Sequence, residues 1–225
     1  MPNLSTYSIN QLETSLRVIR SQNIKGESQK FGSIIEKEIE SREDPEYGDE
    51  FVKLMKRKMS QTSIGASALR NQGAKGLIKI SRYYFENEII LEEFKENLYS
   101  NSYIQYLDNK TDDLLKLFPE KGKSWGAARK GLNLFFRDVI YNYYLRQQLN
   151  INDNSHVHLQ NLEVPLDKDV ASGLKNNNSN LDKWVSIKSL TKQISDKYQN
   201  AAKEIADKKG ILRIHLDLEY WRQIK

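Results

Sequence analysis

The stretch KGLNLFFRDVIYNY, residues 130–143, predicts a long amphipathic helix at the centre of this chain. At about 100° per residue, its large apolar side chains fall within about 80° of Leu132, as in a helix that buries one face. That stripe consists of Leu132, Phe135, Phe136, Val139, Ile140 and Tyr143. The opposite face carries Lys130, Leu134, Arg137 and Tyr141. Lys130 and Arg137 alone would suit a surface exposed to solvent. The apolar side chains of Leu134 and Tyr141 indicate instead that this face of the helix contacts another group.

Apolar residues keep a helical spacing on both sides of this stretch. The spacing predicts further helices over residues 9–20, 31–39, 51–55, 77–84, 94–98, 112–117, 168–175 and 191–209. Asp167 is placed to cap the start of one of them, and Gly210 to end the last. Because only four prolines interrupt the pattern, we predict an all-α fold. Residues 1–60 would form an N-terminal helical extension and residues 61–225 the main domain.

Composition narrows the class of protein. Hydrophobic residues make up 38% of the 225 residues and charged residues 29%, which is typical of a folded soluble protein. There is no cysteine, which excludes disulfides, thiolate metal sites and cysteine catalysis, and three histidines supply a zinc site poorly. No apolar segment approaches the length of about 18 residues that suggests a membrane span. We therefore expect a cytoplasmic protein that neither enters a membrane nor holds a metal.

The charge and two glycine-containing segments favour an anionic partner. A net charge of +5 attracts polyanions such as nucleic acid. Residues 65–76 carry three glycines, and residues 118–126, FPEKGKSWG, form a basic loop with two. Glycine permits close approach of a ligand or of another backbone, although tight connections between helices would use it equally well.

Lys130 and Asp167 form a candidate catalytic pair, 37 positions apart. Breaking an N-glycosidic bond of DNA builds positive charge on the sugar, which a carboxylate stabilises, and a neutral lysine amine can attack the same carbon. Arg129 and Arg137 are candidate cationic neighbours that would favour the neutral amine. Each residue also fits a role without catalysis: Lys130 as a solvated surface lysine, and Asp167 as the N-cap of a helix.

Three motifs occur in order along the chain: Trp125–Asp138, Val164–Ala171, and His215–Asp217 followed by Trp221. Together they resemble the helix-hairpin-helix DNA glycosylases, and among them the archaeal 8-oxoguanine DNA glycosylase family. The resemblance covers roughly residues 64–222 and leaves the first 60 residues without a counterpart. It implies two helical lobes, a helix-hairpin-helix DNA-binding element and an active site between the lobes. It also implies that Lys130 is the Schiff-base nucleophile and that Asp167 activates the sugar.

The resemblance further implies a base pocket and a set of contacts to the DNA backbone. The pocket residues would be Gln72, Arg137, Asp217 and Trp221. Residues 67–85 look like the family helix whose glutamine enters the pocket, while the aspartate binds the flipped base by hydrogen bonds and the indole stacks on it. The backbone contacts would come from Lys121, Gly122, Lys123, Gly126 and Arg129. Without a base pocket, Asp217 would simply form a salt bridge and Trp221 would be an aromatic residue of the hydrophobic core.

The expected function is therefore that of a DNA glycosylase with abasic-site lyase activity. Such an enzyme flips a modified base out of double-stranded DNA, excises it through a lysine Schiff base and nicks the strand by β-elimination. The chemistry requires no metal and no organic cofactor. We expect a monomer associated with the nucleoid, acting in base excision repair on 8-oxoguanine or a related modified base.

Two departures from the family pattern leave alternatives open. The hairpin reads FPEKGKSWG rather than the common Leu-Pro-Gly-Val-Gly form, and Arg137 stands where the family has a lysine. The guanidinium of Arg137 is planar and has five N–H donors, whereas the ammonium of the family's lysine is a compact charge. A hypermodified cytosine of phage DNA, such as a glucosylated one, is therefore a second candidate substrate. The enzyme would then act in phage defence. Alternatives from other classes are a non-catalytic helix-hairpin-helix DNA-binding module and a helical protein whose basic face meets an acidic partner.

Overall fold

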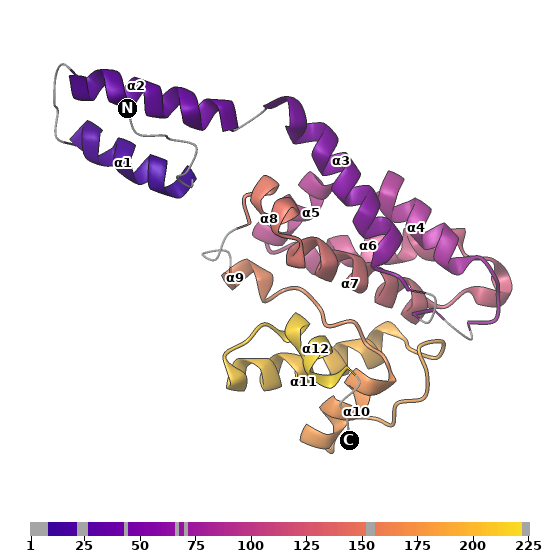
Figure 1. Cartoon of the computed structure of the whole chain (residues 1–225). Helices are drawn as coiled ribbons and strands as arrows, with labels where there is room; N and C mark the ends of the chain where they lie inside the picture. The colour runs from indigo at the N-terminus through magenta and orange to yellow at the C-terminus, as the bar shows by residue number, and fades with distance from the viewer. Residues whose placement is uncertain are drawn as a thin grey trace. The chain divides into compact units, whose positions relative to one another are not determined.

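The computed structural model describes residues 9–21, 27–42, 45–65, 68–69, 72–151 and 156–221. Within these residues the chain is helical and contains no strand, so the predicted all-α class is confirmed (Figure 1). The helices are α1 Ile9–Ser21, α2 Glu27–Arg42, α3 Pro45–Thr62, α4 Leu77–Asn87, α5 Leu91–Tyr99, α6 Tyr103–Leu117, α7 Trp125–Tyr141, α8 Tyr143–Gln148, α9 His156–Leu159, α10 Lys168–Asn177, α11 Lys192–Lys209 and α12 Leu216–Tyr220. Two short 3₁₀ turns are η2, Glu120–Gly122, and η4, Arg213–His215.

The chain divides into two compact units, residues 1–51 and residues 52–225. In the first unit α1 and α2 pack against each other through a small core. Its buried residues are Leu12, Leu16, Ile35 and Ile39, which follow the helical spacing seen in the sequence. The boundary between the units falls within α3, whose later residues Val52, Met55 and Met59 pack against a core of the second unit.

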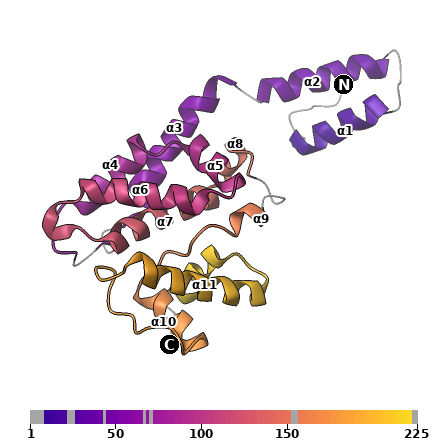
Figure 2. The same cartoon turned by 180° about the vertical axis from the view of Figure 1, so that it is seen from behind.

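The second unit contains two hydrophobic cores, and the first of them surrounds α7. In both views α7 lies beside α6 (Figure 1, Figure 2). Two aromatic pairs join α7 to α4 and α5: Phe85 of α4 stacks on Phe135 with ring centroids 4.8 Å apart, and Phe94 of α5 on Phe136 at 4.5 Å. The predicted apolar stripe therefore builds this core, except for Tyr143, which is largely exposed because α7 ends before it.

The second core is formed by α10, α11 and α12. Its buried residues include Val170, Leu174, Tyr198, Ala202 and Leu216. The ends of α11 follow the sequence prediction. The hydroxyl of Thr191 accepts a hydrogen bond from the amide of Ile194 at 3.3 Å, and Gly210 ends the helix at φ 65°, where glycine is favoured.

Several helix boundaries differ from the sequence prediction; α3, for example, was expected over residues 51–55 and runs from Pro45 to Thr62. α6 begins at Tyr103 rather than near residue 112. The buried side chains of Tyr103, Tyr106 and Thr111 extend the buried face of Leu114 toward the N-terminus of the helix. α4 begins at Leu77, as the apolar spacing predicted, and Gly76 just before it adopts φ 88°; the longer helix that the resemblance implied over residues 67–85 therefore covers only the later part of that range. The short helix α9 had no counterpart among the predicted helices.

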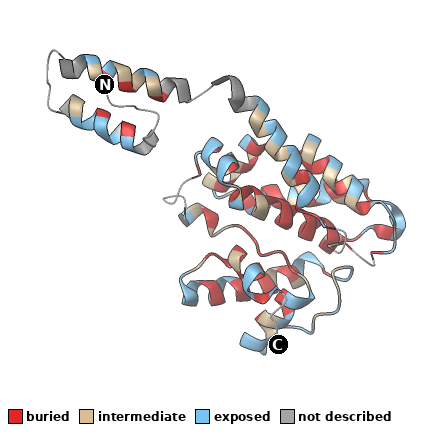
Figure 3. Ribbon diagram, viewed as in Figure 1, coloured by how far each residue is buried: buried red, intermediate tan, exposed pale blue. Residues whose placement is uncertain are grey.

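Both faces of α7 are covered along most of the helix, although Tyr141 at its end is exposed. Figure 3 shows buried residues along most of its length. One face meets the first core, and Lys130 and Leu134 on the other face are buried as well. The second face is therefore not a solvated surface, and the residues around it define the candidate site.

Candidate active site between the two cores

A cavity of about 440 Å³ lies where α7 meets the N-terminal end of α10 and α12. Lys130, Leu134 and Arg137 of α7 line it. The remaining lining residues are Ser63, Gly65, Ala68, Asp167, Asp169, Asp217, Leu218 and Trp221. The structure thus brings together both predicted catalytic residues and three of the four predicted pocket residues.

Lys130 and Asp167 form an ion pair in this cavity. The lysine Nζ donates to Oδ2 of the aspartate at 3.2 Å. The other oxygen, Oδ1, accepts hydrogen bonds from the backbone amides of Asp169 and Val170, each at 3.0 Å. Asp167 is therefore the N-cap of α10 and the partner of Lys130 at once, and the two amides orient the oxygen that faces the amine. Lys130 exposes 7% of its surface, so little bulk water reaches it.

Arg137 and Asp217 form a second ion pair in the same wall, between Nη1 and Oδ2. Nε of Arg137 also donates to Oδ1 of Asp138 at 2.8 Å. Burial raises the pKa of Asp217, and the charge and hydrogen bond of Arg137 oppose that shift. The pair offers a planar ligand both N–H donors and a carboxylate acceptor.

Trp221 lies at the edge of the cavity, directly after α12, and is 58% exposed. The turn before α12 is attached to α7 through Tyr141. The Tyr141 hydroxyl lies 2.8 Å from Nδ1 of His215, and the two rings stack with centroids 5.6 Å apart. Contacts from the second face of α7 therefore hold the segment that carries Asp217 and Trp221.

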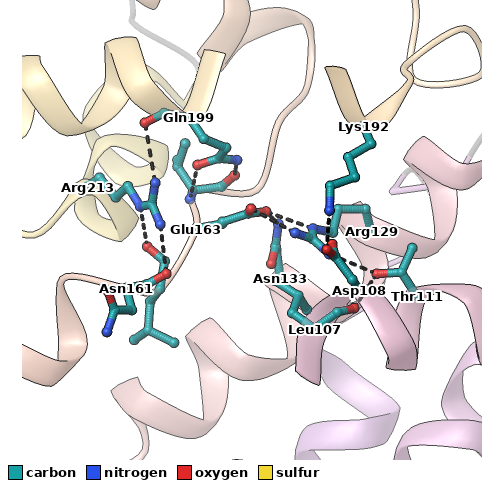
Figure 4. A network of polar contacts seen from close by, with 12 residues as sticks. Leu107, Asp108, Thr111, Arg129, Asn133, Asn161, Glu163, Lys192, Gln199 and Arg213 are labelled. Atoms are coloured by element: carbon teal, nitrogen blue, oxygen red, sulfur yellow. Dashed lines mark hydrogen bonds and ion pairs between the residues drawn. The ribbon is translucent and has the colours of Figure 1, made fainter. Parts of the chain in front are cut away.

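Arg129, the neighbour of Lys130 in sequence, belongs to a buried ionic network (Figure 4). Its Nε and Nη2 donate to the two carboxylate oxygens of Glu163, both at 2.8 Å. Its Nη1 donates to Asp108 at 2.8 Å, and Asn133 donates to Glu163 at 3.0 Å. Burial alone would raise the pKa of Glu163, but the charge and hydrogen bonds of Arg129, together with Arg213 and Asn133, hold it below its ordinary value.

Glu163 lies in the segment that connects the two cores, and this segment is held from both. On its C-terminal side, the amide of Val164 donates to Gln199 at 3.0 Å, and the Gln199 side chain donates back to the Val164 carbonyl at 2.8 Å. On its N-terminal side, Arg213 donates to the carbonyl of Leu162 at 2.7 Å. These bonds fix the path of the chain into the N-cap of α10, and so set its distance from α7.

The network corrects the prediction that Arg129 contacts the DNA backbone. Arg129 is 1% exposed, and its guanidinium is occupied by two carboxylates, Glu163 and Asp108. For the same reason it is not the cationic neighbour expected beside Lys130. Arg137, which lines the same cavity as Lys130, is the other candidate for that role.

The glycines of the predicted hairpin are packed inside the protein. Residues 118–124 join α6 to α7 through η2, and the amide of Gly122 donates to the carbonyl of Pro119 at 2.7 Å. A backbone contact to phosphate through that amide is therefore wrong. Gly126 is buried too, since a Cβ added there would lie 2.2 Å from the carbonyl oxygen of Ile187, which leaves no room for a phosphate on that side.

The two lysines of the hairpin are placed differently from the glycines. Lys121 and Lys123 are both exposed. Lys123 forms an ion pair with Glu120, which partly offsets its charge. The electrostatic part of the predicted backbone contact thus falls mainly to Lys121.

Gln72 lies in a different place from the predicted base pocket. It is 4% exposed and lines a second cavity, together with residues of α10 and of the connection 183–188. The prediction assumed a continuous helix through this region, whereas Gly73 and Gly76 adopt φ 90° and φ 88° and turn the chain before α4. Its assignment to the base pocket is therefore corrected.

Several site residues escaped sequence reasoning. Asp169 and Leu218 line the cavity. Their closeness in sequence to Asp167 and Asp217 could have identified them as site residues. Glu163 had a clearer signal, because a carboxylate within the apolar run of residues 162–166 is buried at a cost unless a cation meets it. Ser63, by contrast, stands in no motif that would have pointed to it.

Across the ranges that the structure describes, no helix combines the length and the apolar character needed to cross a bilayer. The side chains described there also contain no cluster of three or more His, Cys, Asp or Glu residues able to hold a metal ion. Comparison of the chain with protein-family models, with curated proteins and with solved structures gives no match. The functional assignment therefore depends on the chemistry of the site.

Proposed function

We propose that this chain is a DNA glycosylase with abasic-site lyase activity. One observation carries the proposal: Lys130, Arg137, Asp167, Asp217 and Trp221 come from separate parts of the sequence and line one cavity. Its volume of about 440 Å³ lies within the range of about 300–1,000 Å³ that is usual for small-molecule sites, and it suits a nucleobase. The partner would be double-stranded DNA that carries a modified base or an abasic site.

In this proposal Lys130 is the nucleophile. With the base flipped into the cavity, the ammonium of Lys130 passes one proton to the departing base, the glycosidic bond breaks with its electron pair leaving on the base, and the neutral Nζ then bonds to C1′ of the deoxyribose. Asp167 stabilises the positive charge that develops on the sugar. The lysine nitrogen then passes a proton to the ring oxygen O4′, the C1′–O4′ bond breaks, and a protonated imine forms between Nζ and C1′. Removal of a C2′ proton expels the 3′ phosphate, and water finally releases the lysine.

The arrangement around Asp167 supports this role. Its Oδ1 is held by two amides of α10, so Oδ2 is already directed toward Lys130 before any substrate binds. A preorganised carboxylate stabilises a developing cation without having to reorient during the reaction. The low exposure of Lys130 strengthens such electrostatic effects, because it excludes water from the pair.

Arg137, Asp217 and Trp221 would recognise the flipped base. The indole provides a stacking surface, and the ion pair provides directional hydrogen bonds. These groups suit 8-oxoguanine or a related base. They equally suit a glucosylated cytosine of phage DNA, since the fork of Arg137 and the carboxylate of Asp217 can bind sugar hydroxyls. The second substrate would make the protein a phage-defence enzyme.

Borohydride trapping tests the proposal. The full chain is incubated with duplexes that carry an abasic site, 8-oxoguanine, an alkylated base or a glucosylated cytosine, and covalent adducts are resolved on a denaturing gel. We expect adducts with the wild type and with Lys208→Gln, a matched change at an exposed lysine, and none with Lys130→Gln. Undiminished trapping with Lys130→Gln would exclude Lys130 as the nucleophile. Salt-sensitive DNA binding without any adduct or released base would favour the non-catalytic module.

A further inference from the structure

A second cavity, of about 500 Å³, adjoins the first turn of α10. Asp167 and Asp169 line the first cavity, whereas Lys168 between them lines the second. The other walls come from later residues of α10, from the connection 183–188 and from Gln72. The two cavities therefore share one helical turn.

The second cavity is strongly basic. Four lysines line it, Lys168, Lys175, Lys183 and Lys188, and none of its described lining residues is acidic. Lys175 donates to the carbonyl of Leu181 at 2.6 Å. Within the described part of the chain, the other three are exposed and form no ion pair. Cations gathered without counter-charges repel one another, and a bound polyanion relieves that repulsion.

An aromatic side chain stands among these lysines. Trp184 lines the cavity and is half-buried. Its indole meets the ring of Tyr198 edge-on, with centroids 5.6 Å apart and an interplanar angle of 79°, so the second core anchors it. A fixed indole beside cationic side chains is the combination that binds single-stranded nucleic acid, in which phosphates meet lysines and bases stack on aromatic rings.

We propose that the second cavity binds the DNA strand beside the flipped nucleotide, with its lysines on phosphates and Trp184 on an unpaired base. The proposal rests on the proposed function, since it supposes that the first cavity holds the flipped nucleotide. Neighbouring Cα atoms are about 3.8 Å apart, so a strand anchored at Asp167 passes within reach of Lys168 and the basic cavity. The two cavities lie side by side, which fits one continuous DNA strand that enters both better than a free nucleotide bound in the second cavity alone.

The test measures DNA affinity in a Lys130→Gln background, so that no covalent product forms. Anisotropy titrations compare Lys183→Glu/Lys188→Glu with Lys53→Glu/Lys58→Glu, a pair of exposed lysines on α3 that gives the same change in net charge. The probes are a labelled single strand and a duplex with an abasic-site analogue. We expect the cavity pair to weaken single-strand binding at least tenfold more than the control pair. For the cavity pair, the slope of log K against log salt concentration should fall by about 0.7 for each phosphate that the substituted lysines no longer neutralise.

Trp184 provides an independent measurement. Trp184→Ala should weaken single-strand binding by about 5- to 150-fold, the range for one stacked base. Trp184→Phe keeps an aromatic ring, so it should bind more tightly than the alanine variant while losing the fluorescence quenching that the indole shows when DNA binds. Because Trp184 contributes to the second core, the exposed lysine variants guard against a result caused by misfolding.

Two outcomes would overturn the proposal. In the first, both lysine pairs weaken binding equally and the Trp184 variants bind as their parent does. In the second, a deoxynucleoside monophosphate quenches Trp184 while the oligonucleotides bind independently of the cavity, which would define a free-nucleotide site. Failure of the proposed function is recognised separately. Wild-type protein would then form no borohydride adduct, although cavity variants in the affinity assay would still lose DNA binding.

Discussion

Asp167 faces Lys130 with one carboxyl oxygen and the first turn of α10 with the other. The residue thus has a structural role and a proposed chemical role that use different oxygens. Substitutions can separate the two, because asparagine retains a capping oxygen and loses only the charge.

We expect Asp167→Asn to keep the capping of α10, since asparagine and aspartate cap helices equally well, and to lose only the charge that pairs with buried Lys130. Base release should fall by about 10²–10³-fold, because the neutral amide no longer stabilises the sugar cation. Asp167→Ala should lose base release as well, and the loss of the cap should make it less stable than Asp167→Asn by about 0.5–2 kcal/mol in the free energy of unfolding. Urea denaturation and single-turnover base release measure these effects.

Thr191→Ala is the matched control, since it removes the hydroxyl that caps α11, away from the cavity. It should cost a similar free energy of unfolding and leave base release unchanged. Wild-type excision by Asp167→Asn would show that the charge of Asp167 has no part in the reaction.

Arg137→Lys is expected to change which base is excised. Lysine keeps the charge but loses the planar fork that joins Asp217 and Asp138. The rate ratio between 8-oxoguanine and glucosylated cytosine should shift by at least tenfold, whereas nicking at a preformed abasic site should stay within about threefold. A parallel loss of both activities would instead place Arg137 in the chemical step. Lys208→Arg, at an exposed lysine, serves as the control.

Glu163→Gln should strongly destabilise the second unit. It leaves the buried guanidinium of Arg129 with Asp108 as its remaining carboxylate, and breaking such a buried pair typically costs about 3–5 kcal/mol. Chemical denaturation gives the free energy of unfolding. Glu219→Gln, at a partly exposed ion pair with Lys209, should cost less than about 1 kcal/mol. Equal costs for the two variants would argue against the buried network as the link between the cores.

The same carboxylate predicts how stability depends on pH. The folded protein holds the pKa of Glu163 below the ordinary value of about 4.3, so this stabilisation is present above that pH and lost as the pH falls through the folded pKa. The difference in unfolding free energy between the wild type and Glu163→Gln should therefore shrink below about pH 4.3. A difference that stays constant from pH 7 to pH 3 would contradict this assignment. Denaturation series at several pH values measure it.

Gly126→Ala should displace the start of α7. The added Cβ would lie 2.2 Å from the carbonyl oxygen of Ile187 and 2.6 Å from Cβ of Leu190, so backbone must move. We expect a loss of about 1–3 kcal/mol and a lower yield of trapped adduct, because Lys130 follows one turn later. In Gly32→Ala the nearest atom is 3.5 Å away, and this change should be neutral or stabilising. Thermal unfolding and trapping together decide whether the contact positions the lysine.

Local patterns were sufficient for the helices with complete signals. α11 has a capping hydroxyl, a periodic apolar face and a terminal glycine, and its bounds follow from these. The start of α6 was missed, because tyrosine and threonine side chains carry both apolar and polar groups and their burial depends on partners elsewhere in the chain. Tyr143 was misassigned for a related reason: Asn142 caps α8 and turns the chain away from the stripe.

Periodicity, capping residues and motif order can be read from the chain alone, and they were enough to predict the all-α class, the central helix and, as a hypothesis, the pairing of Lys130 with Asp167. The packing of the folded chain was needed to show that these two residues meet, that Arg129 is enclosed by Glu163 and Asp108, and that Gln72 lines a different cavity. The physical reason is that burial and charge pairing depend on which distant segments pack together. Adjacent residues such as Arg129 and Lys130 have similar side chains, but α7 directs one into an ionic network and the other into the cavity.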